Sequence, residues 1–377
     1  MLDPFAATTR GITEPDPVRD ALRANGPLVR VRAPAGGPAW IVTEDALARR
    51  VLTDPRIAKD PAWAPLDWDP RIAGLEQTAA EQPSLTTFDG PDHAQLRRAH
   101  APLLSAARIR DQSDRVHEIA RRLLTEAAGD KVDLMADFTT RFPITVLLDL
   151  LGIPLDRVDA ATDACRRMLS PDPGDQGMAI GALAELAADG LGEGSHGLAA
   201  ELRDRLPAQA TEDELRYHLF ALIFAGQLTT DASLGFLVAR ALSEDFDAVD
   251  DLVRDTLRRH PPAPLTLWRF TTTELDLDGV RLPARAPVLV DIQGINTDPA
   301  RVPGPDLTFG AGPHFCIGAQ LAQLELRAVA NVLRADFPDA RLAVPFAELR
   351  QTTLGGIQGN RLVSLPVELR GGRGSER

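Results

Sequence analysis

The chain has 377 residues, 44% of them hydrophobic, and a formal net charge of −13, which argues against a nucleic-acid partner. Its two cysteines, Cys165 and Cys316, cannot build a disulfide framework, so a reduced, cytoplasmic setting is expected. The N-terminus lacks a basic segment followed by an apolar core, and no stretch reaches the roughly 18 apolar residues of a membrane span. No linker divides the chain, and we predict one domain over residues 1–370 and a disordered tail at 371–377.

The first part of the chain mixes extended and helical patterns. Residues 28–32 alternate, a Pro- and Gly-rich turn follows, and residues 39–42 are extended, which predicts a hairpin. Residues 44–52 have the pattern of a helix. Residues 54–91 are rich in Pro, Asp and Trp with weak periodicity, and long irregular segments in compact proteins are usually functional or mobile.

Helical periodicity dominates residues 93–260. The predicted helices include 116–127, 144–151 and 247–259, and a capping box, Thr211 with Glu214, opens a long helix over 215–242. Extended segments follow at 275–282 and 288–292, then a helix at 319–333 and strands within 356–369. The chain is therefore predicted to be mainly α with small β-sheets.

One short loop carries the strongest chemical signal. Residues 309–318 read FGAGPHFCIG and lead directly into the predicted helix at 319–333. Glycines allow a tight turn and close approach to a flat ligand. The helix N-terminus favours an ionised sulfur at Cys316, and a thiolate is a ligand that haem iron takes from proteins. Packing of a small apolar side chain, the ordinary role of a free cysteine, does not explain these glycines, whereas it suffices for Cys165.

The pattern F-G-x-G-x-H-x-C-x-G resembles the haem-binding loop of the cytochrome P-450 superfamily. The resemblance implies the fold of that family, a triangular helical prism around a buried haem b, with Cys316 as the iron ligand. Phe309 and Gly318 match motif positions that contact the cofactor.

Haem carries two propionates, which require cationic donors. His93 and Arg97 lie four residues apart on one predicted helix face, where both can reach one ligand edge, although such a pair alone is usually only a solvated face. In the family an H-x-x-x-R pair at this place binds a propionate. Arg269 and His314 match two further propionate ligands of the family.

The predicted long helix contains Ala225-Gly226-Gln227-Leu228-Thr229-Thr230. A glycine inside a helix costs about 1 kcal/mol relative to alanine and often marks close approach of a ligand or a local opening. In the family this stretch crosses the oxygen-binding face, and an acid directly before the threonine relays protons with it. Thr229 matches the alcohol, but Leu228 replaces the acid, so protons are expected to travel through Thr229, Gln227, waters or the substrate.

The family's brace beneath the cysteine loop is also altered. In the family this brace is a set of ion pairs between an E-x-x-R motif and a second arginine from the segment before the loop. Asp255 and Arg258 represent the motif here. The segment that supplies the second arginine is shortened, which leaves Arg301 as the candidate for that arginine. The resemblance implies that the loop is braced otherwise or that haem is retained less strongly.

The substrate pocket is named by region only. The segment between Gly152 and the long helix, with glycines in 190–194, is short where the family has lid helices, which suits an open pocket or a large or carrier-bound substrate. By resemblance the lining would come from Trp63, Trp68, Leu85, Phe88, Ala221, Leu222, Leu265, Leu267, Trp268, Leu354 and Ile357. Trp63 and Trp68 are the preferred contacts, because they stand in a polar segment.

Three functions follow from the resemblance. The first is a haem-thiolate monooxygenase that oxidises an organic small molecule of secondary metabolism. Its electrons would come from a ferredoxin and its reductase, with Arg97, Arg98, Arg108 and Arg110 forming a cationic docking face. The second is a related enzyme that couples, cyclises or desaturates its substrate without oxygen insertion. The third is a haem-binding protein without turnover.

Overall fold

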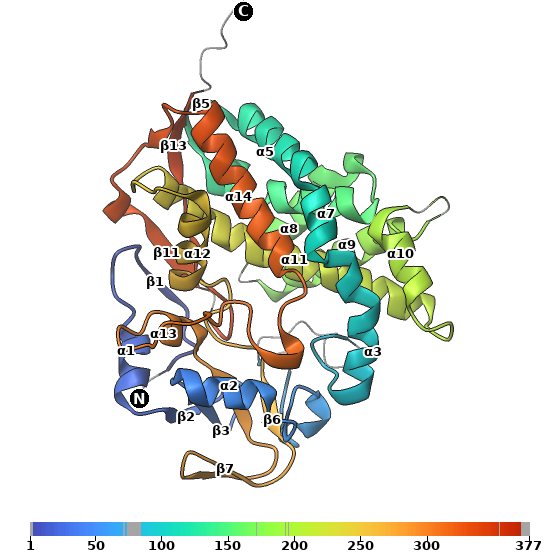
Figure 1. Ribbon diagram of the computed structural model, residues 1–377, viewed down its shortest axis with the longest axis vertical. Coiled ribbons are helices and arrows are strands. Elements are labelled where there is room, and N and C mark those ends of the chain that lie inside the picture. Colours follow the sequence, from blue (N-terminus) through green and yellow to red (C-terminus); the bar gives the residue numbers. More distant parts are fainter. Residues whose placement is uncertain are drawn as a thin grey trace, which may run out of the picture.

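The structure is a computed structural model that describes residues 3–70, 72–73, 84–170, 172–192, 194, 196–353 and 355–370. Helices gather in one half of the molecule, and a mixed sheet with α2 occupies the other (Figure 1). The predicted tail at 371–377 lies outside the described residues.

The elements follow the predicted order along the chain. The helices are α1 (Pro17–Ala24), α2 (Asp45–Thr53), α3 (Gly90–His100), α4 (Ala106–Asp111), α5 (Ser113–Ala127), α6 (Leu134–Asp137), α7 (Arg141–Leu151), α8 (Val158–Met168), α9 (Pro173–Asp189), α10 (Gly197–Arg205), α11 (Glu212–Ala241), α12 (Val249–Arg259), α13 (Ile292–Asn296) and α14 (Ala319–Asp336). The strands are β1 (Thr8–Gly11), β2 (Leu28–Arg32), β3 (Pro38–Val42), β4 (Ile57–Ala58), β5 (Gly129–Asp133), β6 (Arg269–Thr271), β7 (Leu275–Leu277), β8 (Val280–Leu282), β9 (Pro287–Val290), β10 (Arg341–Leu342), β11 (Arg350–Thr353), β12 (Arg361–Leu362) and β13 (Pro366–Leu369).

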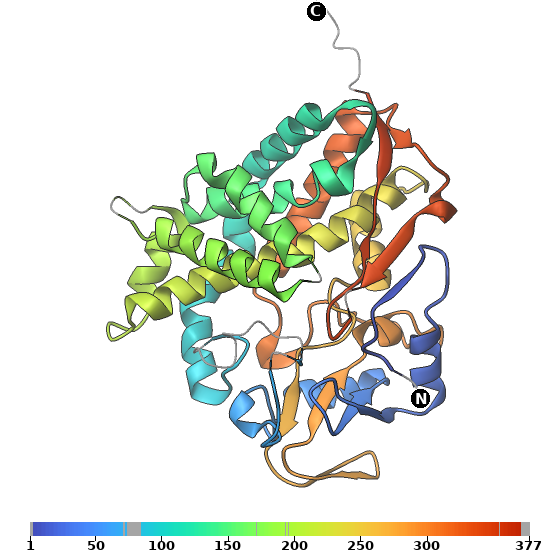
Figure 2. The ribbon, with the colours of Figure 1, turned by 180° about the vertical axis from the view of Figure 1, so that it is seen from behind.

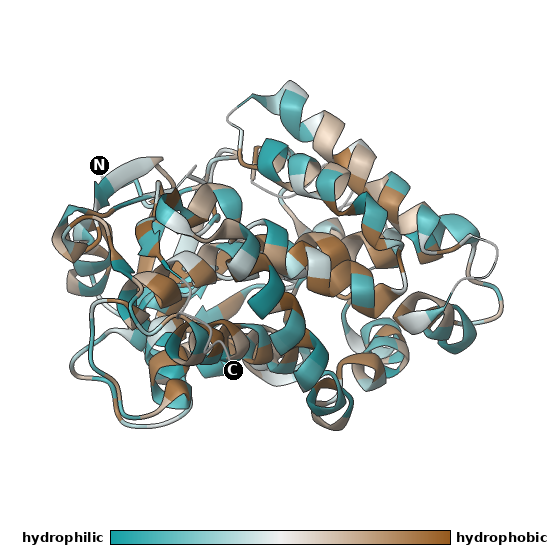
Figure 3. Ribbon diagram, turned by 90° about the horizontal axis from the view of Figure 1, so that it is seen from above, coloured by the Kyte–Doolittle hydropathy of each residue, from teal (hydrophilic) through white to brown (hydrophobic). Residues whose placement is uncertain are grey.

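The long helix α11 is the central element of the helical half. Its predicted capping box is present: Thr211 Oγ1 accepts a hydrogen bond from the Glu214 N–H at 3.1 Å, and the Glu214 carboxylate accepts one from the Thr211 N–H at 2.7 Å. It contacts α7, α9, α12 and α14, and the neighbouring α8 and α9 cover its outer side (Figure 2). By length and mean hydropathy α11 could cross a membrane, but more than half of its most apolar stretch is buried within the protein. Core packing therefore accounts for its apolar residues. Figure 3 shows hydrophobic and hydrophilic residues alternating along the helices.

The five-stranded sheet has the order β2-β3-β9-β6-β4. The predicted hairpin is confirmed as β2 and β3, paired from Leu28 opposite Val42 to Arg32 opposite Pro38. Strand β3 pairs with β9 in parallel, whereas β9–β6 and β6–β4 are antiparallel. This order places the start of β6 and the end of β4 together at the inner end of the sheet.

Two helix boundaries matter for the site. The predicted helix at 44–52 is α2, whose N-cap is Glu44, and the predicted helix at 319–333 is α14, which begins at Ala319. The predicted strands within residues 356–369 are confirmed as β12 and β13. Helix α7 ends as predicted at Gly152, whose φ of 78° and close approach to the His196 carbonyl exclude a side chain.

Candidate functional site

The cysteine loop is a tight turn packed against α2. The Cys316 N–H donates to the Phe309 carbonyl at 2.9 Å, and the Phe315 N–H donates to the Gly312 carbonyl at 3.1 Å. Gly312 has a φ of 72°, and a Cβ there would lie 2.9 Å from the Leu52 carbonyl oxygen. Glycine is thus required at this position by both the backbone conformation and the neighbouring helix.

Cys316 is an exposed residue of this loop and is not part of a disulfide. Desolvation by the surrounding groups is the largest effect and raises the pKa of its thiol above the ordinary value, and hydrogen bonds from the Gly318 and Ala319 N–H groups and the charges of Arg97 and Lys59 offset part of that rise. These donors and cations favour the anionic sulfur that a metal ligand needs. Cys165 differs as predicted: it is 1% exposed, and burial raises its pKa to about 12.

Three of the predicted propionate donors converge beside this loop. His93 is 3% exposed, its Nε2 has no hydrogen-bond partner among the described residues, and burial lowers its pKa to about 4. Arg269, at the start of β6, is 5% exposed and its Nε also has no described partner. Arg97 lies one turn after His93 in α3, and the two border one groove.

His314 differs from the other predicted donors. Its Nε2 lies 3.0 Å from Asp89 Oδ1, and its Nδ1 lies 3.3 Å from the Leu85 carbonyl. Its ring stacks on that of His93 with centroids 4.0 Å apart. Both nitrogens therefore have protein partners, and His314 clamps the segment before α3 onto the cysteine loop. A propionate could bind His314 only by replacing one of these contacts.

These residues fit a haem. Unpaired buried donors such as His93 Nε2 and Arg269 Nε are costly unless a ligand satisfies them, and both lie on the side of the loop where Arg97 and Lys59 act on the sulfur. Within the described part of the chain, no group of three or more His, Cys, Asp or Glu side chains could hold a metal ion. A single thiolate suits an iron whose other ligands come from a porphyrin.

Two of the four predicted catalytic residues lie on one exposed face of α11, the face that the resemblance assigns to oxygen binding. Ala225 and Thr229 are exposed one turn apart, and Thr229 Oγ1 donates to the Ala225 carbonyl at 2.7 Å. Gln227 instead is 1% exposed, and its Nε2 has no described partner. A proton route through Gln227 at this face is therefore not supported by its position.

Gly226 has a packing role that its sequence context did not indicate. A Cβ on Gly226 would lie 3.1 Å from the side chain of Leu147 in α7, and α11 remains a regular helix through this stretch. The expected local opening of the helix is wrong. The glycine lets α7 approach α11 closely.

Glu325 is a residue that sequence reasoning missed. It lies in α14, is 2% exposed, and its Oε2 accepts a hydrogen bond from Thr230 Oγ1 at 3.2 Å. Burial raises its pKa to about 8, so the carboxyl holds a proton at neutral pH. The signal available in the sequence was an acid within the apolar run of the helix at 319–333. Its hydroxyl partner, Thr230, adjoins Thr229.

The brace around Asp255 is complete but differently composed. Its carboxylate lies 2.6 Å from Arg258 Nη2, 2.7 Å from Arg259 Nε and 2.8 Å from Arg240 Nη2. Arg301, the predicted replacement, instead lies with its Nε 3.6 Å from Asp45 Oδ1 in α2. The third corner of the brace therefore comes from α11.

Asn296 fastens the shortened segment to the brace. It accepts a hydrogen bond from the Leu307 N–H at 2.8 Å and donates to Thr308 Oγ1 at 3.2 Å, and Thr308 Oγ1 donates to the Leu257 carbonyl at 3.1 Å. Arg258 Nη1 donates to the Asn296 carbonyl at 2.9 Å. The residues that enter the cysteine loop are thus held to α12 without a further arginine.

The predicted pocket residues divide into two groups. Trp68 packs edge-on against Trp268 and Phe270, with centroids 4.9 and 5.5 Å apart, and Trp268 is 2% exposed with its Nε1 donating to the Ala73 carbonyl. Trp268 nevertheless lines a small hollow together with Lys59 and Leu267. Leu265 and Ile357 are 1% and 6% exposed. Contact of these three residues with a ligand stays a prediction.

The second group of predicted pocket residues is at least partly exposed to solvent. Trp63 is 38% exposed and lies under the Arg285 guanidinium. Partial burial is shared by Leu85, Phe88, Ala221, Leu222 and Leu267. Leu354 lies outside the described residues.

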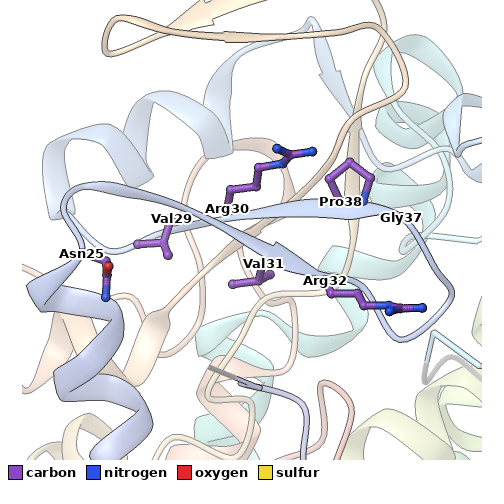
Figure 4. A pocket seen from close by; sticks show the side chains of 7 residues that line it. All are labelled: Asn25, Val29, Arg30, Val31, Arg32, Gly37 and Pro38. Carbon is purple, nitrogen blue, oxygen red and sulfur yellow. The ribbon is translucent and has the colours of Figure 1, made fainter. Parts of the chain in front are cut away.

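Two open hollows flank the molecule. One, of about 680 Å³, runs between α3 and the cysteine loop and is lined in part by His93, Arg97, Arg98 and Gly312. The other, of about 530 Å³, lies against the β2–β3 hairpin (Figure 4) and is lined by none of the predicted site residues. Of these two hollows, the first adjoins the site, and a smaller one beside it is lined in part by Lys59, Trp68, Leu267 and Trp268.

Comparisons with known proteins agree with this site. The chain is 42% identical to the cytochrome P-450 monooxygenase DoxA of Streptomyces sp. strain C5, over 98% of each chain, and 32% identical to PikC of Streptomyces venezuelae, over 96% of this chain and 92% of PikC. Among solved structures, CYP154C4 from Streptomyces sp. W2061 has a TM-score of 0.82 at 26% identity, covering 97% of each chain. CYP154A1 from Streptomyces coelicolor A3(2) has a TM-score of 0.81 at 27% identity, covering 98% of this chain and 99% of its own. No protein-family model matches the chain.

The chain belongs to the cytochrome P-450 monooxygenases. It is a soluble, haem-dependent oxidoreductase of secondary metabolism that uses dioxygen to oxidise an organic small molecule and takes its electrons from a redox partner. The alignment with DoxA runs over 414 positions, more than the 377 residues of this chain, so DoxA contains residues that this chain lacks.

Proposed function

We propose that the chain inserts one oxygen atom into a bulky, mostly apolar small molecule held between a Cys316-bound haem and the Ala225–Thr229 face of α11. The observation that carries the proposal is the Cys316 loop, which places the sulfur just before the N-terminus of α14 and beside the buried, unpartnered donors His93 Nε2 and Arg269 Nε. The bound haem would supply the activation of dioxygen.

The chain's own groups have separate roles in this proposal. His93, Arg97 and Arg269 bind the propionates, which supply the hydrogen-bond acceptors that the buried donors lack. Phe309 and Gly318 border the cofactor. Thr229 Oγ1 holds a proton at the oxygen-side face, and waters connect it to the protein interior. Leu228 offers no acid, so the proton supply depends on groups other than a neighbouring carboxylate.

The substrate class is supported by relatives named as hydroxylases of organic molecules. These include a vitamin D(3) 25-hydroxylase at 31% identity and a mycinamicin IV hydroxylase/epoxidase at 29%. Trp63, Leu85, Phe88, Ala221, Leu222 and Leu267 remain the proposed apolar lining, consistent with a mostly apolar ligand.

Electrons come from a cytoplasmic ferredoxin and its reductase in this proposal. The docking face is the groove between α3 and the cysteine loop, which Arg98 borders. Arg98 and Arg110 are exposed and have no described ion pair, whereas Arg108 is neutralised by Glu201. Arg98 and Arg110 are therefore the preferred contacts for an acidic partner.

Product mass tests the proposal. The purified protein, a ferredoxin–reductase pair and a ligand that shifts the Soret band are incubated under isotope-labelled dioxygen. The expected product gains one labelled oxygen atom. A product that loses two hydrogens and gains no oxygen would favour desaturation, coupling or ring closure instead.

A further inference from the structure

Lys59 and Arg269 form an unusual pair of like charges. Strands β4 and β6 are antiparallel, with Ile57 opposite Thr271 and Ala58 opposite Phe270, so the next residue, Lys59, comes opposite Arg269. Lys59 is 9% exposed and Arg269 is 5% exposed. Like charges directly opposite each other destabilise a sheet, and burial increases the cost. Burial and the charge of Arg269 lower the pKa of Lys59 to about 7.

The nearby carboxylate does not neutralise this pair. Asp89 Oδ2 accepts hydrogen bonds from the backbone N–H groups of Lys59 and Asp60, at 2.6 and 3.1 Å, and Oδ1 faces His314 Nε2 at 3.0 Å. Among the described residues no ion pair joins Asp89 to the side chain of Lys59 or Arg269. The charge of Asp89 acts to raise the pKa of both cations, but its oxygens accept hydrogen bonds from other groups.

The excess charge faces the cysteine loop. The charge of Lys59 acts on the thiol of Cys316, as does that of Arg97. The charges of Lys59, Arg97 and Asp89 all act on His93, and those of Arg269 and Asp89 act on Lys59, so three cations and one carboxylate lie on this side of the loop. A buried cluster of this kind is stabilised by a ligand that carries carboxylates.

We propose that Lys59 binds a propionate of the haem and that its charge raises the reduction potential of the iron. This inference rests on the proposed haem at Cys316 and adds a residue that the resemblance did not indicate. Lys59 and Arg269, from adjacent strands, then share the cofactor's carboxylates. An ammonium near the iron favours the ferrous form, which carries one positive charge less than the ferric form.

The chain offers a matched control, because Lys59 and Lys131 are its only lysines. Lys131 lies exposed in β5 and adjoins none of the proposed haem contacts. The haem-loaded wild type, Lys59→Met, Lys59→Gln, Lys59→Arg and Lys131→Met are compared in two measurements. The first is the rate of haem transfer to excess apomyoglobin, and the second is the reduction potential.

Lys59→Met and Lys59→Gln are expected to lose haem about tenfold faster and to have a more negative potential, because one charge-assisted contact is removed. Lys59→Arg and Lys131→Met should match the wild type in both measurements. If Lys59 serves only packing, Lys59→Met loses haem at the wild-type rate with an unchanged potential, and the inference is overturned. A wild type that binds no haem through its thiolate would instead refute the proposed function itself.

Discussion

The guanidinium of Arg240 in α11 lies 2.8 Å from the carboxylate of Asp255 in α12. The helix that carries Thr229 is therefore tied directly to the brace beneath the cysteine loop. Arg240 also donates to Thr256 Oγ1 at 3.0 Å and pairs with Glu244, and its side chain is 7% exposed. The shortened segment after Asn296 needs no arginine in this brace, because α11 supplies one.

Replacing Arg240 tests this brace. Arg240→Met should reduce stability by about 2 kcal/mol, because it leaves a partly buried carboxylate with two of its three arginines. The measurement is the denaturant concentration at which the reduced, carbon-monoxide-bound protein loses its long-wavelength Soret band. Arg301→Met is the control, since Arg301 pairs with Asp45. An Arg301→Met loss equal to or larger than that of Arg240→Met would contradict the assignment.

Substitutions on the Ala225–Thr229 face of α11 should reduce the fraction of consumed electrons that ends in product. Thr229→Val should lower product formation about 100-fold while electron consumption continues, because a positioned proton donor is removed. Leu228→Glu should change the ratio of hydrogen peroxide to product. Both ratios are measured with a surrogate ferredoxin and its reductase. Unchanged peroxide release in Leu228→Glu would count against position 228 facing the oxygen site.

Glu325 predicts a pH dependence of stability. Its pKa is raised to about 8 in the folded protein, above the ordinary value of 4.5, so the folded state holds a proton that the unfolded state releases. Its favourable contribution is complete below pH 4.5 and is lost as the pH rises through about 8. Glu325→Gln cannot ionise and should gain stability relative to wild type over this window. The prediction would be refuted if the denaturation midpoints of wild type and Glu325→Gln changed in parallel with pH over this range.

The buried His100–His218 pair should make the folded protein less stable at low pH. The rings lie edge to face with centroids 4.9 Å apart, both are buried, and burial lowers the pKa of His218 to about 3. The neutral rings therefore contribute stability above the ordinary pKa of 6.5, and it is lost as the pH falls through about 3. His218→Phe should lose less stability than wild type on acidification. His117→Phe, on the partly exposed side of α5, is the control and should follow the wild-type curve.

Substitution of Trp268 and of Trp63 should differ in its effect on stability. Trp268→Phe should cost about 1 kcal/mol, because the bond from Nε1 to the Ala73 carbonyl is lost inside the core. Trp63→Phe should be nearly neutral for stability, since Trp63 is 38% exposed. Denaturant titration measures both. Equal losses would show that Trp63 belongs to the core.

Local signals predicted much of the fold. The capping residues Thr211 and Glu214 determine where α11 begins, and Gly152 determines where α7 ends, because each depends on groups within a few residues. Gly310 and Gly312 of the cysteine loop have positive φ, and Gly312 is also required by the close approach of α2, so this part of the motif reflects the backbone of the loop itself.

Contacts between distant segments were not predictable in the same way. The sequence did not indicate that Lys59 comes opposite Arg269, because this depends on the β4–β6 register. The burial of Glu325 depends on how α14 packs on α11, and the role of Gly226 depends on the position of Leu147. Trp68 resembled a ligand contact because its neighbours in the chain are polar, yet its partners in space are aromatic.

The most direct test of the haem assignment is the spectrum of the reduced protein with carbon monoxide. The wild type is predicted to have the long-wavelength Soret band of a thiolate-bound haem, and Cys316→Ala is predicted to lack it while Cys165→Ala keeps it. A wild type without this band, or a Cys316→Ala protein that retains it, would contradict the assignment of Cys316 as the iron ligand.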